Sequence, residues 1–174
     1  FQAEDGIRDS LGLVGSEMCI RDRDGVSVES DTLGALLYPL EGDTFALDMV
    51  IKPERYHEFG IALHVDKELE TGYFLRMNPK NQLVAWDMWP RGEQGRYQWQ
   101  IKGDVPYQIE TARKLPKAEE YRVHIIKEKD ICVVYINDEI VLSTRMYNHK
   151  DGYAGIYVVQ GDVKLIQYKE KRSE

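Results

Sequence analysis

The chain is short of the residue patterns on which most catalytic and cofactor sites are built. It has only two cysteines and four histidines, and none of them falls at the spacing of a zinc site or of a His-Glu-x-x-His motif. A glycine-rich phosphate loop and a nucleophile elbow are also missing. The histidines, His57, His64, His124 and His149, are scattered along the chain. We therefore expect no metal, no cofactor and no catalytic residue here.

Long apolar runs and concentrated positive charge are lacking as well. No stretch approaches the roughly 20 apolar residues that span a bilayer, and the chain does not begin with the charged and apolar regions of a signal peptide. The formal net charge is −7, and lysines and arginines form no patch that could follow a phosphate backbone. We expect neither a membrane nor a nucleic acid as partner, and the cellular location stays open.

The first 23 residues resemble translated sequencing-adaptor DNA. Residues 2–9 are the translation of CAAGCAGAAGACGGCATACGAGAT, and residues 13–22 are the translation of CTCGTGGGCTCGGAGATGTGTATAAGAGAC. A native helix capped by Ser10 is the alternative, but its apolar residues are poorly spaced for an amphipathic helix. We expect residues 1–23 to be an unstructured, adaptor-derived artefact and residues 24–174 to form a single domain.

Setting residues 1–23 aside changes three conclusions. Cys19 is removed, so Cys132 has no intramolecular partner, and its place in an apolar strand predicts a small buried side chain. The segment holds five acidic residues and three arginines, which leaves a formal charge of −5 on the rest. An adaptor joined to a reading frame also predicts that the natural gene continued upstream, and hence that this chain is a C-terminal fragment.

From Asp24 onward, β-branched and aromatic runs alternate with turn signals, and no amphipathic helix of useful length occurs. The predicted strands cover residues 33–40, 44–51, 59–65, 72–77, 82–89, 121–127, 131–136, 140–146, 155–160 and 163–168. Residues 90–116 are expected to form loops and short edge strands, because glycines and prolines interrupt them. The pattern predicts an all-β fold, a two-sheet antiparallel β-sandwich of the concanavalin or lectin-like jelly-roll kind.

The hairpin predicted at residues 131–147 presents a first group of candidate functional side chains. Its second strand alternates between two faces, with Leu142, Thr144 and Met146 on the core side and Ser143, Arg145 and Tyr147 on the polar side. The Arg145 guanidinium could bind vicinal hydroxyls or a carboxylate, with Tyr147 beside it. The alternative is a structural ion pair with Asp138 or Glu139 across the hairpin, or a contact with a partner domain.

A second group lies in residues 86–91. A sugar ring presents an apolar face for stacking and hydroxyls for paired hydrogen bonds. Asp87 and Trp89 share one face of a strand, and Arg91 follows at its end. The alternative is that Trp86 belongs to the core and Trp89 packs on a neighbouring strand. The candidate carbohydrate-binding or domain-contact residues are therefore Asp87, Trp89, Arg91, Arg145 and Tyr147.

Seven short motifs follow one another between residues 72 and 161. They are Gly72-Tyr-Phe-Leu-Arg76, Trp86-Asp-Met-Trp-Pro-Arg91, Ile109-Glu-Thr-Ala-Arg-Lys-Leu115, Tyr135-Ile-Asn-Asp138, Leu142-Ser-Thr-Arg-Met-Tyr147, Gly155-Ile-Tyr-Val158 and Gly161. In this order they resemble the C-terminal β-sandwich of glycoside hydrolase family 32, the levanases, invertases and related β-fructosidases. In that family the sandwich packs against a five-bladed propeller, which holds the fructoside and supplies the catalytic Asp and Glu. The propeller motifs are missing here, so the resemblance implies no catalytic residue in this chain.

The resemblance implies an accessory C-terminal domain of a fructan- or sucrose-hydrolysing enzyme, which is not catalytic alone and supports a missing N-terminal propeller. The alternative is a fructan-type carbohydrate-binding module, because related stand-alone modules bind terminal fructose residues. An unrelated structural or protein-binding sandwich is a third hypothesis. The first hypothesis predicts an exposed apolar patch on one sheet face, and the second predicts binding of fructose-containing saccharides.

Overall fold

The computed structural model describes residues 12–14, 18–22, 24–89 and 107–172, and the regular structure in these ranges is β-strand. The strands are β1 (Gly12–Val14), β2 (Met18–Asp22), β3 (Gly25–Leu40), β4 (Thr44–Arg55), β5 (Glu58–Val65), β6 (Gly72–Asn78), β7 (Leu83–Trp89), β8 (Tyr107–Gln108), β9 (Tyr121–Glu128), β10 (Ile131–Ile136), β11 (Ile140–Arg145) and β12 (Gly152–Arg172). The predicted all-β class is confirmed. Within these ranges, no helix has the length and apolar character needed to cross a membrane.

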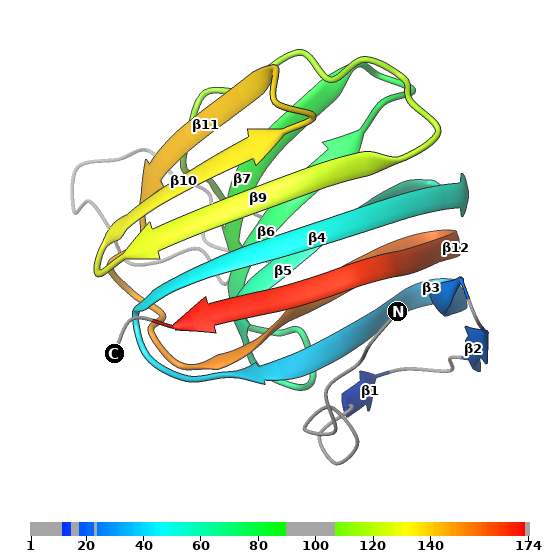
Figure 1. The fold of residues 1–174 in the computed structure, drawn as a ribbon, viewed down its shortest axis with the longest axis horizontal. Coiled ribbons are helices and arrows are strands. Elements are labelled where there is room, and N and C mark those ends of the chain that lie inside the picture. Colours follow the sequence, from blue (N-terminus) through cyan, green and yellow to red (C-terminus); the bar gives the residue numbers. More distant parts are fainter. Residues whose placement is uncertain (1–11, 15–17, 23, 90–106, 173–174) are drawn as a thin grey trace.

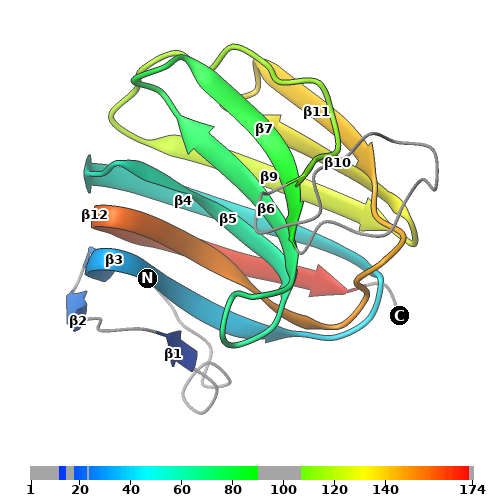
Figure 2. The ribbon, with the colours of Figure 1, turned by 180° about the vertical axis from the view of Figure 1, so that it is seen from behind.

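The strands form two layers that lie face to face (Figures 1 and 2). We call β11-β10-β9-β4-β12-β3 the front layer and β3-β12-β5-β6-β7-β8 the back layer. Strand β12 belongs to both, because residues 153–159 pair with β5 and residues 162–172 pair with β4. Strand β3 runs beside β12 through both layers, since residues 33–40 pair with residues 152–159 and residues 26–30 pair with residues 161–165. The layers are therefore one continuous antiparallel sheet that folds over a shared core, as the predicted sandwich requires.

Period-two alternation of apolar side chains builds that core. In β4 the inward positions are Phe45, Leu47, Met49 and Ile51, and each is at most 3% exposed. They belong to the same core cluster as six side chains of β6 and β7 in the back layer, namely Tyr73, Leu75, Met77, Val84, Trp86 and Met88. Each fully buried side chain of this size contributes about 1.5–3 kcal/mol of hydrophobic free energy, so the inward row of each strand fixes its register against the other layer.

The predicted hairpin is present as β10 and β11, and its faces are as the alternation requires. Leu142, Thr144 and Met146 are buried, whereas Ser143, Arg145 and Tyr147 are exposed. Cys132 is fully buried, as predicted. Burial raises the pKa of its thiol to about 12, so the side chain acts as a small core residue and not as a nucleophile.

Strand β12 differs from the prediction, which divides it into two strands at residues 155–160 and 163–168. Gln160 has a φ of 47° and the register with β3 shifts between Val159 and Gly161, so the two residues form a β-bulge. A Cβ atom on Gly161 would lie 2.0 Å from the Arg55 carbonyl oxygen. The Gln160-Gly161 pair therefore carries the strand from one layer to the other and does not end it.

Strands β1 and β2 lie within residues 1–23. Both pair with β3, β1 through Leu13 and Leu36 and β2 through Cys19 and Val28. These short segments form strands where the sequence analysis expects none. Strand pairing does not test where the segment comes from, so its adaptor origin stays a prediction.

Candidate functional site

A cavity of about 480 Å³ opens where β11, the edge strand of the front layer, faces β6 and β7 of the back layer. We call it the Arg145 cavity. It is lined by Tyr73, Met88, Ile109, Glu110, Ile131, Ser143, Thr144, Arg145, Tyr147 and Asn148. Its volume lies in the range of about 300–1,000 Å³ that is typical of small-molecule sites.

Arg145 and Tyr147 both line this cavity, as their shared strand face predicts. Arg145 is paired in register with Ile131, at the far end of the hairpin from the turn. Asp138 and Glu139 lie in that turn, roughly 20 Å away at the rise of a β-strand. The alternative of a cross-hairpin ion pair is therefore excluded by geometry.

Two further polar residues of the cavity, Glu110 and Asn148, were not identified from the sequence. The Ile109 N–H donates to the Trp86 carbonyl at 2.9 Å, which holds this segment against β7. The Glu110 carboxylate accepts the Thr111 N–H at 2.8 Å. The segment around Glu110 has no alternation of apolar and polar residues that could predict which way its side chain points. Its place in the 109–115 motif is the one signal in the sequence that could have indicated Glu110.

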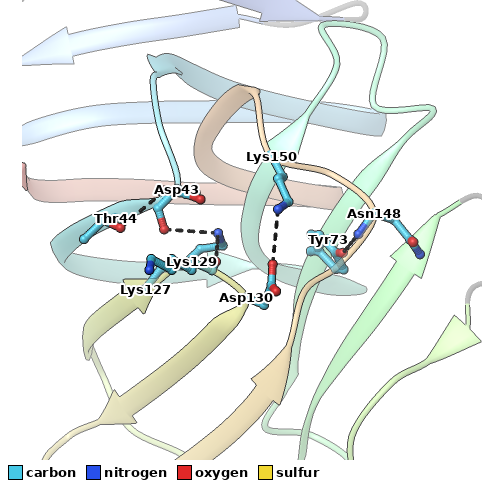
Figure 3. A network of polar contacts seen from close by, with 8 residues as sticks. All are labelled: Asp43, Thr44, Tyr73, Lys127, Lys129, Asp130, Asn148 and Lys150. Atoms are coloured by element: carbon cyan, nitrogen blue, oxygen red, sulfur yellow. Dashed lines mark hydrogen bonds and ion pairs between the residues drawn. The ribbon is translucent and has the colours of Figure 1, made fainter.

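The connection between β11 and β12, which carries Tyr147 and Asn148, is held by hydrogen bonds and an ion pair (Figure 3). The Asn148 N–H donates to the Tyr73 hydroxyl at 3.0 Å, and the Asn148 side-chain amide lies 3.1 Å from the Met88 sulfur. Lys150 Nζ lies 3.3 Å from the Asp130 carboxylate. Burial raises the pKa of Tyr73, so its hydroxyl stays protonated. The cavity wall is thus fixed before any ligand arrives.

A buried lysine closes the same end of the sandwich. Lys127 faces the core from β9 and its ammonium donates to the carbonyl oxygens of Asp43, at 3.3 Å, and Lys129 (Figure 3). It also lies 5.9 Å from the centre of the Phe45 ring. Burial lowers the pKa of Lys127, although Asp43 opposes this effect. The side chain ties the β3–β4 connection to the β9–β10 connection beside the cavity.

Asp87 and Trp89 lie apart from the Arg145 cavity. Met88 lines the cavity, so its neighbours in the strand point to the opposite face of β7. There the Asp87 carboxylate is 2.9 Å from Arg76 Nε, with only 7% of its side chain exposed. Burial raises the pKa of Asp87, and Arg76 opposes this effect. Arg91 lies outside the described residues, and a saccharide role for these three residues stays a prediction.

The Arg145 cavity offers a guanidinium, a carboxylate, a side-chain amide, the hydroxyls of Tyr73, Ser143 and Thr144, and the exposed ring of Tyr147. Sugar hydroxyls donate and accept hydrogen bonds at once, and sugar rings stack on aromatic faces, so this set suits a polyhydroxylated ligand. Within the part of the chain that the structure describes, no three His, Cys, Asp or Glu side chains converge as a metal site needs.

No family model matches the sequence of the chain, and a search of curated proteins found no match. Its structure is similar to that of the carbohydrate-binding module CBM66 from Bacillus subtilis, with a TM-score of 0.73 at 17% identity over 95% of this chain and 98% of that one. The fold is a lectin-like β-sandwich. The lectin-like fold is also that of the VIP36 exoplasmic/lumenal domain bound to Ca²⁺ and Man3GlcNAc, with a TM-score of 0.65 at 11% identity over 94% of this chain and 84% of that one.

A third similar structure is a Parabacteroides distasonis protein named for an expected glycosyl hydrolase activity. Its TM-score is 0.58 at 16% identity, over 90% of this chain and 83% of that one. At these identities the likeness establishes the lectin-like β-sandwich and leaves the ligand to be argued from the residues of the cavity. Membership of glycoside hydrolase family 32 stays a prediction from the motifs.

Proposed function

We propose that this chain is a carbohydrate-binding domain that holds a saccharide in the Arg145 cavity. The observation that carries the proposal is the convergence of Glu110, Arg145, Tyr147 and Asn148 on one cavity of about 480 Å³. Arg145 and Glu110 provide charge-assisted hydrogen bonds to vicinal hydroxyls, and Tyr147 provides a stacking surface. The likeness in fold to CBM66 supports the same proposal.

In this proposal the ligand is a fructose-containing saccharide such as levan or inulin. The support comes from the motif series, because four of its motifs supply the walls of the cavity. Tyr73 belongs to the first, Met88 to the second, Glu110 to the third and Arg145 to the fifth. Four motifs that are distant in sequence, and that together resemble one family, thus line the same Arg145 cavity. The domain would serve as a non-catalytic accessory to a fructan- or sucrose-hydrolysing enzyme with a propeller domain.

Titration calorimetry of the full 174-residue chain with fructose, levan and inulin oligosaccharides tests this proposal. We expect heat at millimolar ligand, and an affinity at least about tenfold weaker for Arg145→Gln, the loss expected when one charge-assisted contact is removed. Arg55→Gln is the matched control, because Arg55 pairs with Glu29 on an exposed surface and is not in the cavity wall. If no fructose-containing saccharide gives heat, the proposal is wrong.

The same side chains could instead contact the propeller of a parent enzyme, as the sequence analysis also allows. In such an enzyme the propeller and this sandwich would belong to one chain. In the joined enzyme, a domain contact predicts that Arg145→Gln lowers the unfolding temperature and leaves saccharide affinity unchanged. A saccharide site predicts the reverse, so one variant separates the two roles.

A further inference from the structure

A second cavity, of about 430 Å³, lies over β4, β9, β10 and β12 on the outer face of the front layer, which is the face seen in Figure 1. It shares no lining residue with the Arg145 cavity. The side chains that give it chemical character are Asp48, Arg122, His124, Tyr135, Asp138 and Gln167.

Three of these residues stand side by side across the strands. Asp48 of β4 is paired in register with His124 of β9, which is paired with Tyr135 of β10. The His124 Nδ1 atom is hydrogen-bonded to the Asp48 carboxylate, which fixes the orientation of the ring. The His124 and Tyr135 ring centres are 6.2 Å apart with 37° between the planes. Because Tyr135 is 37% exposed, the two rings present an aromatic surface with a carboxylate at one end.

The neighbouring row adds hydrogen-bonding groups on the side of the β10–β11 turn. Gln167 and Arg122 flank Val50 of β4 in register, one on each side. The Arg122 N–H donates to the Asn137 side chain at 2.8 Å, and the Asn137 N–H donates to the Arg122 carbonyl at 2.9 Å. These bonds hold the turn that carries Asp138 against β9. The Asp138 carboxylate and the Arg122 guanidinium therefore line the cavity, and both project from backbone that these hydrogen bonds hold in place.

The charges of this surface disfavour a polyanionic ligand. Asp48 and Asp138 oppose Arg122, so the field of the cavity does not attract a polyanion such as a nucleic acid. A neutral ring with hydroxyls at its edge matches an aromatic surface that is flanked by both donors and acceptors. We propose that the outer face of β4, β9 and β10 is a second saccharide-binding site, in which a sugar ring stacks on Tyr135 and its hydroxyls bond to Asp48, His124 and Arg122.

The second site stands on its own residues and does not depend on the Arg145 cavity. Tyr135 and Ile131, one from each cavity, are four residues apart on β10, which is roughly 13 Å. A competing occupant is another protein domain, because Ile126 and Val141 are also exposed on β9 and β11. The experiment therefore has to separate the two cavities and the two kinds of ligand.

Nitrogen-15 NMR titration of the full chain with tetrasaccharides of fructose, mannose and galactose makes this separation. We expect the amide signals of residues 48–50, 122–124 and 135–138 to shift with at least one sugar and to saturate independently of those near Arg145. Tyr135→Ala should lower the affinity obtained from these shifts at least about tenfold. It should leave the affinity obtained from the signals near Arg145 unchanged. Tyr147→Ala, which removes the exposed tyrosine of the other cavity, should do the opposite.

Arg122→Gln keeps the test decisive if Tyr135→Ala does not fold, because 72% of the Arg122 side chain is exposed and its ion pair with Glu120, at 3.8 Å, is a surface pair of small energy. The Arg122→Gln variant should lower the affinity obtained from the same group of signals severalfold. Absence of shifts in these residues at millimolar concentrations of all three sugars overturns the proposal, as do shifts that both variants leave unchanged. So does docking of a parent propeller domain on this face without any saccharide response. Shifts here but not near Arg145 support the second site and refute the function proposed for the first.

Discussion

Arg76 Nε lies 2.9 Å from the Asp87 carboxylate across β6 and β7, on the outer face of the back layer, which Figure 2 shows. On the same face the Tyr157 hydroxyl donates to the Glu58 carboxylate at 3.1 Å. Burial raises the pKa of both carboxyl groups, and the charge of Arg76 opposes this effect at each. One guanidinium thus compensates a buried acid, Asp87, and a half-buried one, Glu58, which is the arrangement of a structural ion pair.

We predict that Arg76→Gln lowers the free energy of unfolding and leaves saccharide affinity unchanged. The variant leaves Asp87 buried without its cation, but the Arg76 side chain is 32% exposed. The expected loss is therefore about 2 kcal/mol, below the roughly 3–5 kcal/mol for a fully buried pair. Urea unfolding measures it, and Arg76→Gln combined with Asp87→Asn should recover part of the loss. Lost affinity with unchanged stability would instead make Asp87 a ligand.

The face on which a residue lies could be predicted from the sequence more readily than its partner. Period-two alternation follows from strand geometry alone, so the buried and exposed rows around Arg145 and the inward position of Trp86 could be predicted directly. The partner of Asp87 depends on the register between β6 and β7. That register is set by packing across the whole sandwich, so it cannot be predicted from residues 86–91 alone.

Tertiary contacts override local preference at other positions. Lys127 occupies an inward position of β9 although lysine is rarely buried, because carbonyl groups of two connections satisfy its ammonium. Gln160 and Gly161 have the composition of a turn and form a bulge within β12. Glu110 reaches the cavity from a segment without periodicity. These features depend on contacts between distant segments, which pattern analysis cannot supply.

His64 makes stability depend on pH. It is 1% exposed, and the backbone of Asp151 is the polar group that its ring contacts. Burial, together with the nearby Lys127 charge, lowers the pKa of His64 to about 4, while the Asp151 carbonyl opposes this effect. An unfolded histidine has a pKa of about 6.5, so between these values the unfolded chain binds more protons. The stabilisation, of about 3 kcal/mol, is complete above pH 6.5 and is lost as pH falls towards 4.

We predict that His64→Asn flattens the fall in stability between pH 6.5 and 4. Asparagine tolerates the positive φ of 53° at this position, and its side chain does not titrate. Urea unfolding at several pH values measures the slope for both proteins. Glu58 and Asp87, whose pKa values are raised, change stability in the opposite direction in both, so the difference isolates His64. Equal slopes would contradict the assignment.

We predict that Gly155→Ala destabilises the sandwich by about 3 kcal/mol, at the upper end of overpacking costs. A Cβ atom at this position would lie 1.8 Å from the Leu36 carbonyl oxygen, in the ladder between β12 and β3. Gly42→Ala is the control, because its Cβ would meet nothing within 4 Å and only its φ of +82° opposes the change. It should cost about 1 kcal/mol. Similar midpoints of thermal unfolding in the two variants would show that the backbone of β3 shifts at Leu36 to accommodate the added methyl group, and would contradict the prediction.

The Tyr121 hydroxyl links stability to the Arg145 cavity. It accepts the Ala118 N–H and donates to the Pro116 carbonyl, each at 2.9 Å, and so anchors the segment that brings Glu110 to the cavity wall. We predict that Tyr121→Phe lowers the free energy of unfolding by about 0.5–1.5 kcal/mol, because water replaces the hydroxyl at the exposed residues Pro116 and Ala118, and weakens saccharide binding severalfold. Tyr168→Phe is the matched control, since that buried hydroxyl has no hydrogen-bond partner within residues 24–89 and 107–172, and its removal should leave both quantities nearly unchanged. Urea unfolding and calorimetry measure them on the same samples. If Tyr121→Phe lowers stability without any change in affinity, the anchor does not control the position of Glu110.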